Sequence, residues 1–242
     1  MNTHALLMRT RYRLRTGISH IPSIYLLLTK LRHRDEDGAK IVTPATDLVV
    51  EAFPRSGNTF TVTALQHSQP RRLNIAHHCH APAQLIRAVR LRKPALLIVR
   101  QPKDAVLSFV LRHPGISMEL GLKSWLHFHR SLLPFTAGMM VATFDQVTND
   151  LGAVVNRINE RFGTTFSSFE HTAANEAEIF GAIEARNKKR FGHKEVDEMG
   201  VARPSGERAG RKAALEEHWQ ADHLRLHREA AASLYEKLSS LA

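Results

Sequence analysis

This chain of 242 residues has little cysteine and no long apolar run near its N-terminus. Cys79 is the single cysteine, so an intrachain disulfide is impossible and a reducing compartment is the simpler interpretation. The apolar run from Ile24 to Leu28 is far too short to span a bilayer, and a secretory signal would need a longer apolar core. We therefore expect a cytoplasmic protein.

Acidic residues are absent from the first 34 positions. The segment carries Arg9, Arg11, Arg13 and Arg15 among its basic residues. We interpret residues 1–38 as a basic leader that precedes the core and is dispensable for its chemistry. A transit peptide, or an arm in peripheral contact with an anionic membrane, are the alternatives. Residues 39–242 are then predicted to form one domain.

The charge of the whole chain is strongly positive, with 34 Lys and Arg against 23 Asp and Glu and a formal net charge of +11. Such a charge favours anionic partners, among them nucleotides, nucleic acids, acidic glycans and membrane surfaces, without choosing among them. Apolar residues at 43% and charged residues at 24% indicate a globular domain with a buried core.

Short apolar runs alternate with segments of helical periodicity along the middle of the chain. The runs lie at 48–50, 72–76, 95–99 and 139–144, and helical segments begin near 59, 82, 102 and 150. This alternation predicts an α/β fold, with a mostly parallel central sheet flanked by helices in three layers. In such sheets ligands bind beyond the carboxyl ends of the strands, where the unusual residues of this chain lie.

Residues 187–212 are basic, poor in large apolar side chains and punctuated by glycine. We interpret them as a long mobile loop before a closing C-terminal helix. The apolar stripe of that helix consists of Ala231, Leu234, Tyr235, Leu238 and Leu241.

The first loop of interest runs from Phe53 to Phe60, between a predicted strand and a predicted helix. Backbone N–H groups of such a turn, with a helix N-terminus behind them, form an anion site. The segment resembles a nucleotide P-loop, but Gly57-Asn58-Thr59 stands where the Walker pattern has Gly-Lys-Thr, and its cation is Arg55 upstream. An ordinary ATPase or GTPase is therefore less favoured, and a simple turn with a helix cap is the alternative.

The second loop runs from Val99 to Phe109. Arg100 lies at the end of a predicted strand, and Ser108 lies on the helix that follows. A guanidinium with a nearby hydroxyl suits a phosphate, because the guanidinium offers planar paired donors. The alternative is an Arg that binds a carboxylate and a Ser that faces solvent.

Together the two loops resemble those of the cytosolic and bacterial sulfotransferase family. The family's 5′-phosphosulfate loop reads Pro-Lys/Arg-Ser-Gly-Thr/Asn-Thr, and its 3′-phosphate motif has Arg and Ser spaced as Arg100 and Ser108 are here. The similarity covers roughly residues 46 to 165, through Trp125 and Phe128 to the strand that ends at Phe144-Asp145.

This resemblance implies a P-loop-like fold and the co-substrate 3′-phosphoadenosine 5′-phosphosulfate (PAPS), with its product 3′-phosphoadenosine 5′-phosphate (PAP). The residues expected to bind it are Arg55, Ser56, Gly57, Asn58, Thr59, Phe60, Arg100 and Ser108. Phe60 either stacks on the adenine or packs its helix. A basic C-terminal residue is expected to close over the 3′-phosphate. Arg208 is our choice among Arg203, Arg208, Arg211 and Lys212.

A histidine cluster lies between the two loops, in the sequence Ala76-His77-His78-Cys79-His80-Ala81-Pro82. The family commonly has its catalytic His two residues before a Pro and five before a Leu, a spacing that His80, Pro82 and Leu85 reproduce. The resemblance thus implies that His80 is the general base, because a neutral imidazole can remove the acceptor's proton near neutral pH. Many members have Lys where this chain has His78, and the role of His78 stays open.

Two alternatives concern this cluster. His and Cys are good zinc ligands, but four consecutive residues cannot all face one tetrahedral centre, and we expect no metal. A carboxylate base is used by some sulfotransferases. Glu51 lies close to the first loop but inside the strand, where a packed or capping role is the better interpretation.

The implied activity is direct in-line transfer of the sulfuryl group to a hydroxyl or amine, with Arg55 stabilising charge on the leaving phosphate. The sequence does not identify the acceptor, whether a small molecule, a glycan or a lipid. A nucleotide-dependent kinase on a related fold is the alternative enzyme. A non-enzymatic protein that binds anions or nucleic acid is the alternative from another class, although no specific nucleic acid is expected.

Overall fold

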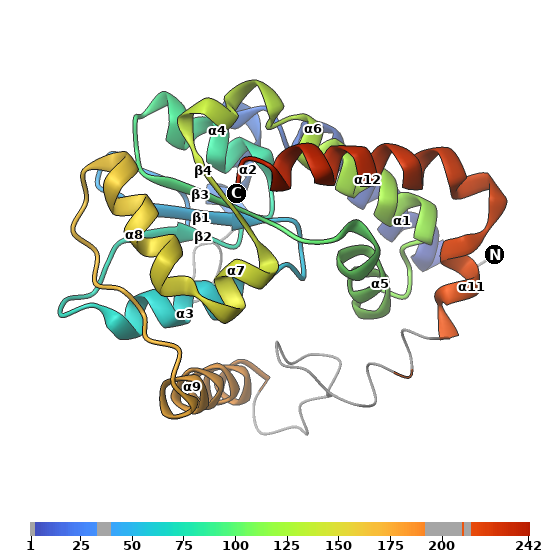
Figure 1. The fold of residues 1–242 in the computed structure, drawn as a ribbon. Helices are drawn as coiled ribbons and strands as arrows, with labels where there is room; N and C mark the ends of the chain where they lie inside the picture. The colour runs from blue at the N-terminus through green and yellow to red at the C-terminus, as the bar shows by residue number, and fades with distance from the viewer. Residues whose placement is uncertain (1–2, 33–39, 192–209, 211–213) are drawn as a thin grey trace.

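The computed structural model describes residues 3–32, 40–191, 210 and 214–242. Within these ranges the strands form one parallel sheet of four strands in the order β2-β1-β3-β4. The strands are β1 (Leu48–Ala52), β2 (Ile75–His77), β3 (Ala95–Val99) and β4 (Met140–Thr143). The predicted α/β fold with a parallel central sheet between helices is confirmed (Figure 1).

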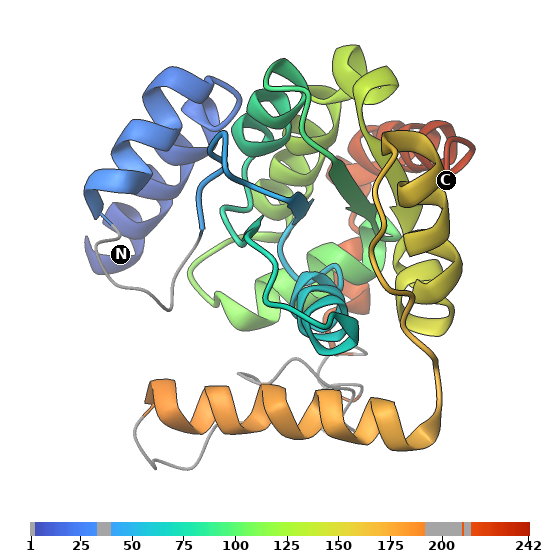
Figure 2. The same cartoon turned by 90° about the vertical axis from the view of Figure 1, so that its left-hand side faces the viewer.

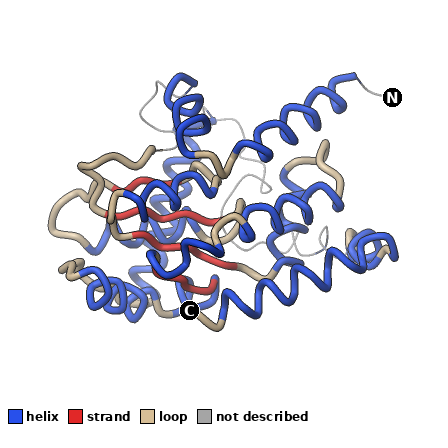
Figure 3. The backbone as a smooth tube through the Cα atoms, turned by 90° about the horizontal axis from the view of Figure 1, so that it is seen from above, coloured by secondary structure: helices blue, strands red, loops and turns tan. Residues whose placement is uncertain are grey.

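Strand residues alternate between two core clusters, one on each face of the sheet. Val49, Leu97 and Val141 belong to one cluster, whereas Leu48 and Leu96 belong to the other. All residues of β1 and β3 are buried, as expected of central strands covered on both faces. The sheet is thus the middle of three layers (Figure 3).

The helices divide between the two core clusters. One cluster holds side chains of α3 (Asn58–Ser68), α7 (Phe144–Asn149), α8 (Leu151–Phe162) and α9 (Ala173–Phe191). The other holds side chains of α2 (Pro22–Arg32), α4 (Pro82–Arg90), α5 (Pro102–Arg112), α6 (Met118–Arg130), α11 (Glu216–Gln220) and α12 (Arg225–Ser239). Two short 3-10 helices, η1 (Leu133–Gly138) and η3 (Asp222–Leu224), complete the described elements.

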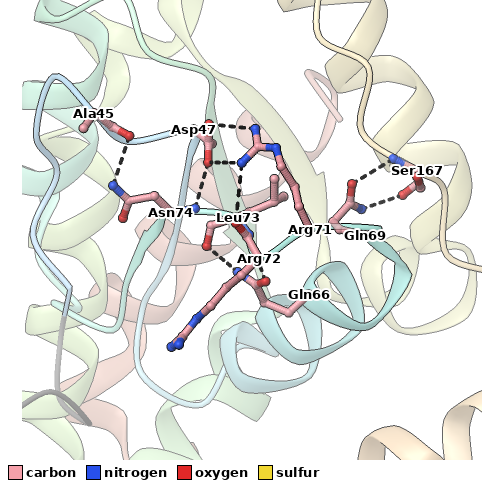
Figure 4. A network of polar contacts seen from close by, with 9 residues as sticks. All are labelled: Ala45, Asp47, Gln66, Gln69, Arg71, Arg72, Leu73, Asn74 and Ser167. Carbon is pink, nitrogen blue, oxygen red and sulfur yellow. Dashed lines mark hydrogen bonds and ion pairs between the residues drawn. The ribbon is translucent and has the colours of Figure 1, made fainter.

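The amino ends of β1 and β2 are closed by a polar network (Figure 4). Asp47 accepts a hydrogen bond from the backbone N–H of Asn74 at 2.8 Å and an ion pair from Arg71 at 3.3 Å. Gln69 and Ser167 exchange two bonds of 2.9 and 3.0 Å, which join the end of α3 to the segment after α8. The amino ends of these strands are thus held by contacts within the protein itself.

The described part of the N-terminal segment packs against the domain, and its dispensability for the chemistry stays a prediction. It forms α1 (Thr3–Ile18) and α2, which lie together along one side of the molecule (Figure 2). Tyr25 and Leu26 of α2 are buried in the core, and the carbonyl of Ser19 accepts the N–H of Ala83 at 2.9 Å. The sequence did not reveal these few apolar inward positions, because the segment as a whole is basic. No described helix is long and apolar enough to cross a membrane.

The first residues of the predicted C-terminal loop are helical. Residues 187–191 are the last turn of α9, and the rest of the predicted loop, with Arg208, lies outside the described residues apart from Gly210. The stripe predicted on the closing helix is buried at Ala231, Leu234 and Leu238. Leu241 follows the end of α12 and is exposed.

Candidate functional site

Three loops meet at the carboxyl ends of three neighbouring strands. The first loop follows β1, the histidine cluster follows β2, and the second loop follows β3, and these strands are adjacent in the sheet. Strand ends that are neighbours in a parallel sheet place the loops after them at the same edge. The three loops, which are separated by about 20 residues or more in the sequence, therefore lie close together at this edge of the sheet.

The first loop turns into the N-terminus of α3 through a glycine in the left-handed region. Gly57 has φ of 90° and stands at the N-cap, so it provides no side chain to cap the first N–H groups of the helix. A Cβ at this position would lie 3.1 Å from the ring of Phe144, a second reason why glycine is needed. Uncapped N–H groups at a helix N-terminus favour an anion.

Arg55 contacts both Arg100 and Ser108, the two residues expected from the sequence to converge on one ligand. Arg55 Nε donates to Ser108 Oγ at 3.1 Å, and Arg100 Nη1 donates to the Arg55 carbonyl at 2.7 Å. The Arg100 guanidinium also stacks over the Phe144 ring, 4.0 Å from its centroid. Two half-buried guanidinium groups and a hydroxyl therefore share one small region of positive charge.

Two buried polar side chains of the first loop have hydrogen-bonding capacity that no described partner takes up. They are Ser56, 1% exposed, at Oγ, and Asn58, 3% exposed, at both side-chain polar atoms. Buried polar groups are nearly always paired, so unpaired ones call for a physical explanation. Donors of this kind, beside Arg55 and the α3 N-terminus, fit an oxyanion such as a phosphate or sulfate.

The imidazole of His80 is held in a defined tautomer. Its Nδ1 lies 2.9 Å from the carbonyl of Ala52, which can only accept, so Nδ1 carries the proton and Nε2 keeps a lone pair. Burial, with smaller contributions from the positive charges of Arg15 and Arg55, lowers the pKa of His80 to about 4. The ring is therefore neutral near pH 7 and able to accept a proton at Nε2.

Glu51 anchors the histidine loop from inside the sheet. Its fully buried carboxyl accepts the N–H of Cys79 at 2.7 Å and the N–H of His80 at 3.0 Å. Burial raises the pKa of Glu51 to about 8. This position agrees with the packed or capping role expected of Glu51, and both oxygens are engaged by the backbone that it holds.

His78 links the histidine loop to the first loop. Its Nε2 lies 3.1 Å from Thr59 Oγ1, and its Nδ1 lies 2.6 Å from Nδ1 of His77. Burial lowers the pKa of His77 to about 4, so that ring is neutral. Across the described ranges, no cluster of three or more His, Cys, Asp or Glu side chains is arranged to hold a metal ion.

The N-terminal helices also contact the histidine loop. Arg15 Nη2 and the Tyr25 hydroxyl donate to the Cys79 carbonyl at 3.3 and 3.2 Å, and Arg15 Nε donates to the Tyr25 hydroxyl at 2.8 Å. Sequence reasoning missed this contact. Arg15 belongs to a run of similar arginines, and nothing in that run distinguishes it.

Left-handed backbone conformations of residues other than glycine concentrate in these loops. Arg55 has φ of 70°, His78 of 60° and His80 of 48°, and in the described chain only Arg92 joins them. Each costs about 1–3 kcal/mol and persists only where surrounding contacts hold it. Here the bonds to Arg100, Thr59 and Glu51 do so. The loops are thus preorganised at some cost in stability.

Aromatic side chains form the support behind the site. Phe60 is 7% exposed and packs against Phe169 and Phe180, with ring centroids 6.1 and 5.8 Å away, which fits the packing alternative. Phe53, at the start of the first loop, contacts the rings of Phe109 and Phe128 at 5.4 and 6.1 Å. The helix α6, which carries Trp125 and Phe128, therefore supports the first loop.

Of the comparisons with known proteins, the one with solved structures finds similar chains. No family model and no curated protein matches the chain. The crystal structure of mouse sulfotransferase SULT7A1 complexed with PAP is similar with a TM-score of 0.42 and 13% sequence identity, over 78% of this chain and 90% of that chain. At this level of similarity, any inference about function depends on the residues of the site.

Proposed function

We propose that this chain is a sulfotransferase that moves the sulfuryl group of PAPS to a hydroxyl or amine. The observation that carries the proposal is the convergence of Arg55, Arg100 and Ser108 beside His80, from loops after three adjacent strands. This arrangement combines an anion site for a doubly phosphorylated donor with a neutral base. A kinase that uses ATP would need no site for a 3′-phosphate.

The first loop is proposed to bind the 5′-phosphosulfate. Its α3 N-terminus, Arg55 and the side chains of Ser56 and Asn58 offer donors to the oxygens that gain charge as the bond between sulfur and the bridging oxygen breaks. Such donors stabilise the leaving phosphate without having to reorganise. The phosphate of PAP leaves without taking up a proton, because the proton of the acceptor goes to a separate base.

His80 is proposed to take that proton. The acceptor oxygen or nitrogen attacks sulfur opposite the leaving phosphate, and Nε2 of His80 accepts the proton as the new bond to sulfur forms. A bound anion beside the imidazole stabilises its charged form and raises its pKa from the low value of the free protein. Base strength therefore increases when the donor is bound.

Arg100 and Ser108 are proposed to recognise the 3′-phosphate. Arg100 has five N–H donors, and its ring contact with Phe144 fixes the plane in which they lie. Arg208 remains our proposal for a residue that closes over this phosphate, at a position outside the described residues.

The test is transfer of labelled sulfur. Purified protein is incubated with sulfur-labelled PAPS and fractionated host extract, and the labelled product is identified. We expect label in a product that is absent when His80→Asn replaces the wild type. Transfer from the γ-phosphate of ATP instead would favour the kinase. Nucleotide binding that salt alone abolishes, with no transfer, would favour a non-enzymatic anion-binding protein.

A further inference from the structure

Exposed apolar side chains concentrate on the two N-terminal helices. The large hydrophobic side chains exposed in the described structure are Leu7, Met8, Leu14, Ile24, Leu27, Leu28, Leu31, Leu226 and Leu241. Seven of these nine lie on α1 and α2. Scattered exposed leucines are ordinary, but a concentration on one hairpin indicates an interaction surface.

The helix α2 has two opposite apolar faces. The positions that pack inward are Pro22, Tyr25, Leu26 and Thr29. The positions that face outward are Ile24 at 46% exposed, Leu27 at 57%, Leu28 at 50% and Leu31 at 65%. Each set follows the spacing of three and four residues that places side chains on one helix face. Core packing explains the inward-facing residues. The outward-facing residues have no partner in the part of the chain that the structure describes.

The charge around this surface is positive. Arg9, Arg11, Arg13 and Lys30 are exposed on the same two helices, and the first 34 residues contain no Asp or Glu. Arg11 lies between Leu7 and Leu14 on one face of α1, because the three are spaced by four and three residues. Glu119 of the neighbouring α6 is already ion-paired with Lys123. A basic rim around exposed leucines suits an anionic bilayer surface.

We propose that the α1–α2 hairpin is an interfacial docking surface for a membrane of anionic phospholipid. The outward leucines enter the boundary between headgroups and acyl chains, and the basic side chains contact headgroup phosphates. A second copy of the chain is a poorer occupant, because a symmetric contact through this surface would bring arginines against arginines. The hairpin lies along the outer side of the molecule, where a flat surface can reach it (Figure 2). This proposal does not depend on the donor chemistry.

Vesicle flotation of the full chain tests the proposal. The probes are vesicles of phosphatidylcholine with and without phosphatidylserine. The variants are Leu27→Gln/Leu31→Gln for the apolar face and Arg11→Gln/Lys30→Gln for the charge. Leu226→Gln is the matched control, since this leucine is 69% exposed on α12, away from the hairpin. Circular dichroism of each variant confirms folding.

Wild type and Leu226→Gln are expected to bind anionic vesicles equally and to bind phosphatidylcholine far less. The double leucine variant should lose at least about tenfold in affinity, and the double charge variant roughly fivefold for each cation removed. Binding that both double variants retain would overturn the proposal. Binding lost with salt but unaffected by the leucine changes would mean electrostatic adsorption only, which also overturns it. A wild-type dimer by light scattering that Leu27→Gln/Leu31→Gln converts to a monomer would identify a second copy as the occupant instead.

Discussion

At the scale of single residues, the environment of His80 determines what its imidazole can do. The Ala52 carbonyl fixes the proton on Nδ1, and the Glu51 carboxyl holds the backbone of His80 at a φ of 48°. Replacing His80 by Ala would remove the base and also disturb this backbone. Asparagine tolerates the left-handed region and its amide N–H₂ can replace the Nδ1–H donor, which isolates the loss of the base.

We predict that His80→Asn lowers turnover at least about a hundredfold while PAP affinity stays within about twofold of wild type, because a general base acts on the acceptor. Single-turnover transfer and PAP titration measure the two quantities. His77→Asn, three residues earlier at the end of β2, is the control and should retain turnover. Near wild-type turnover by His80→Asn would instead direct attention to His78.

The pH dependence of kcat/KM gives a second prediction for His80. Its neutral form is the active one, so activity is lost as pH falls through its pKa, which burial lowers to about 4. We expect kcat/KM for PAPS, which reports the pKa of the free protein, to be flat from about pH 8 to pH 6 and to fall only in the region of pH 4–5. Recovery of activity after return to pH 7 separates this loss from acid unfolding. An acidic limb centred near pH 6.5 would contradict the assignment, since that is the pKa of an ordinary histidine.

At the scale of elements, the N-terminal hairpin supports the histidine loop through the Cys79 carbonyl. We predict that Arg15→Ala lowers turnover about tenfold and leaves PAP affinity nearly unchanged, because the lost charged hydrogen bond positions His80 and not the anion loop. Arg11→Ala, an exposed arginine of the same helix, is the control, assayed on a soluble acceptor. Arg15→Lys should restore part of the turnover. Full activity of Arg15→Ala would show that Glu51 alone positions the loop.

Sequence patterns predicted the elements that carry short apolar runs or turn residues. The run at 95–99 matches β3, and the proline at 82 opens α4, whereas the second strand begins at Ile75 and not at 72. The contact of Arg100 with Arg55 depends on the order of the strands, which the sequence did not predict. The packing of α2 could not be predicted, because its inward residues are outnumbered by basic and outward apolar ones. The backbone contacts of Glu51 depend on register between β1 and the loop after β2, which composition does not encode.

At the scale of the whole molecule, the two ends of the sheet differ in character. The amino ends are tied together by Asp47 and its partners, while the carboxyl ends carry strained loops and guanidinium groups. A formal net charge of +11 adds long-range attraction for an anionic donor. Polar contacts thus close one end of the sheet, and the groups proposed to bind the donor lie at the other.

Recognition of the 3′-phosphate is the central claim. Hydrogen bonds to charged groups contribute about 1.5–3 kcal/mol each, so Arg100 and Ser108 together should give PAP a preference over adenosine 5′-phosphate on the order of a hundredfold. The variant Arg100→Ala should lose most of this preference and change adenosine 5′-phosphate affinity little. Arg90→Ala, an exposed arginine of α4, is the matched control and should keep the preference.

Calorimetric titration of PAP, adenosine 5′-phosphate and ATP into wild type, Arg100→Ala and Arg90→Ala is the most direct measurement. The proposed function predicts PAP as the tightest ligand of wild type and of Arg90→Ala, with its advantage largely gone in Arg100→Ala. Equal affinities for PAP and adenosine 5′-phosphate in the wild type, or tighter binding of ATP, would contradict it.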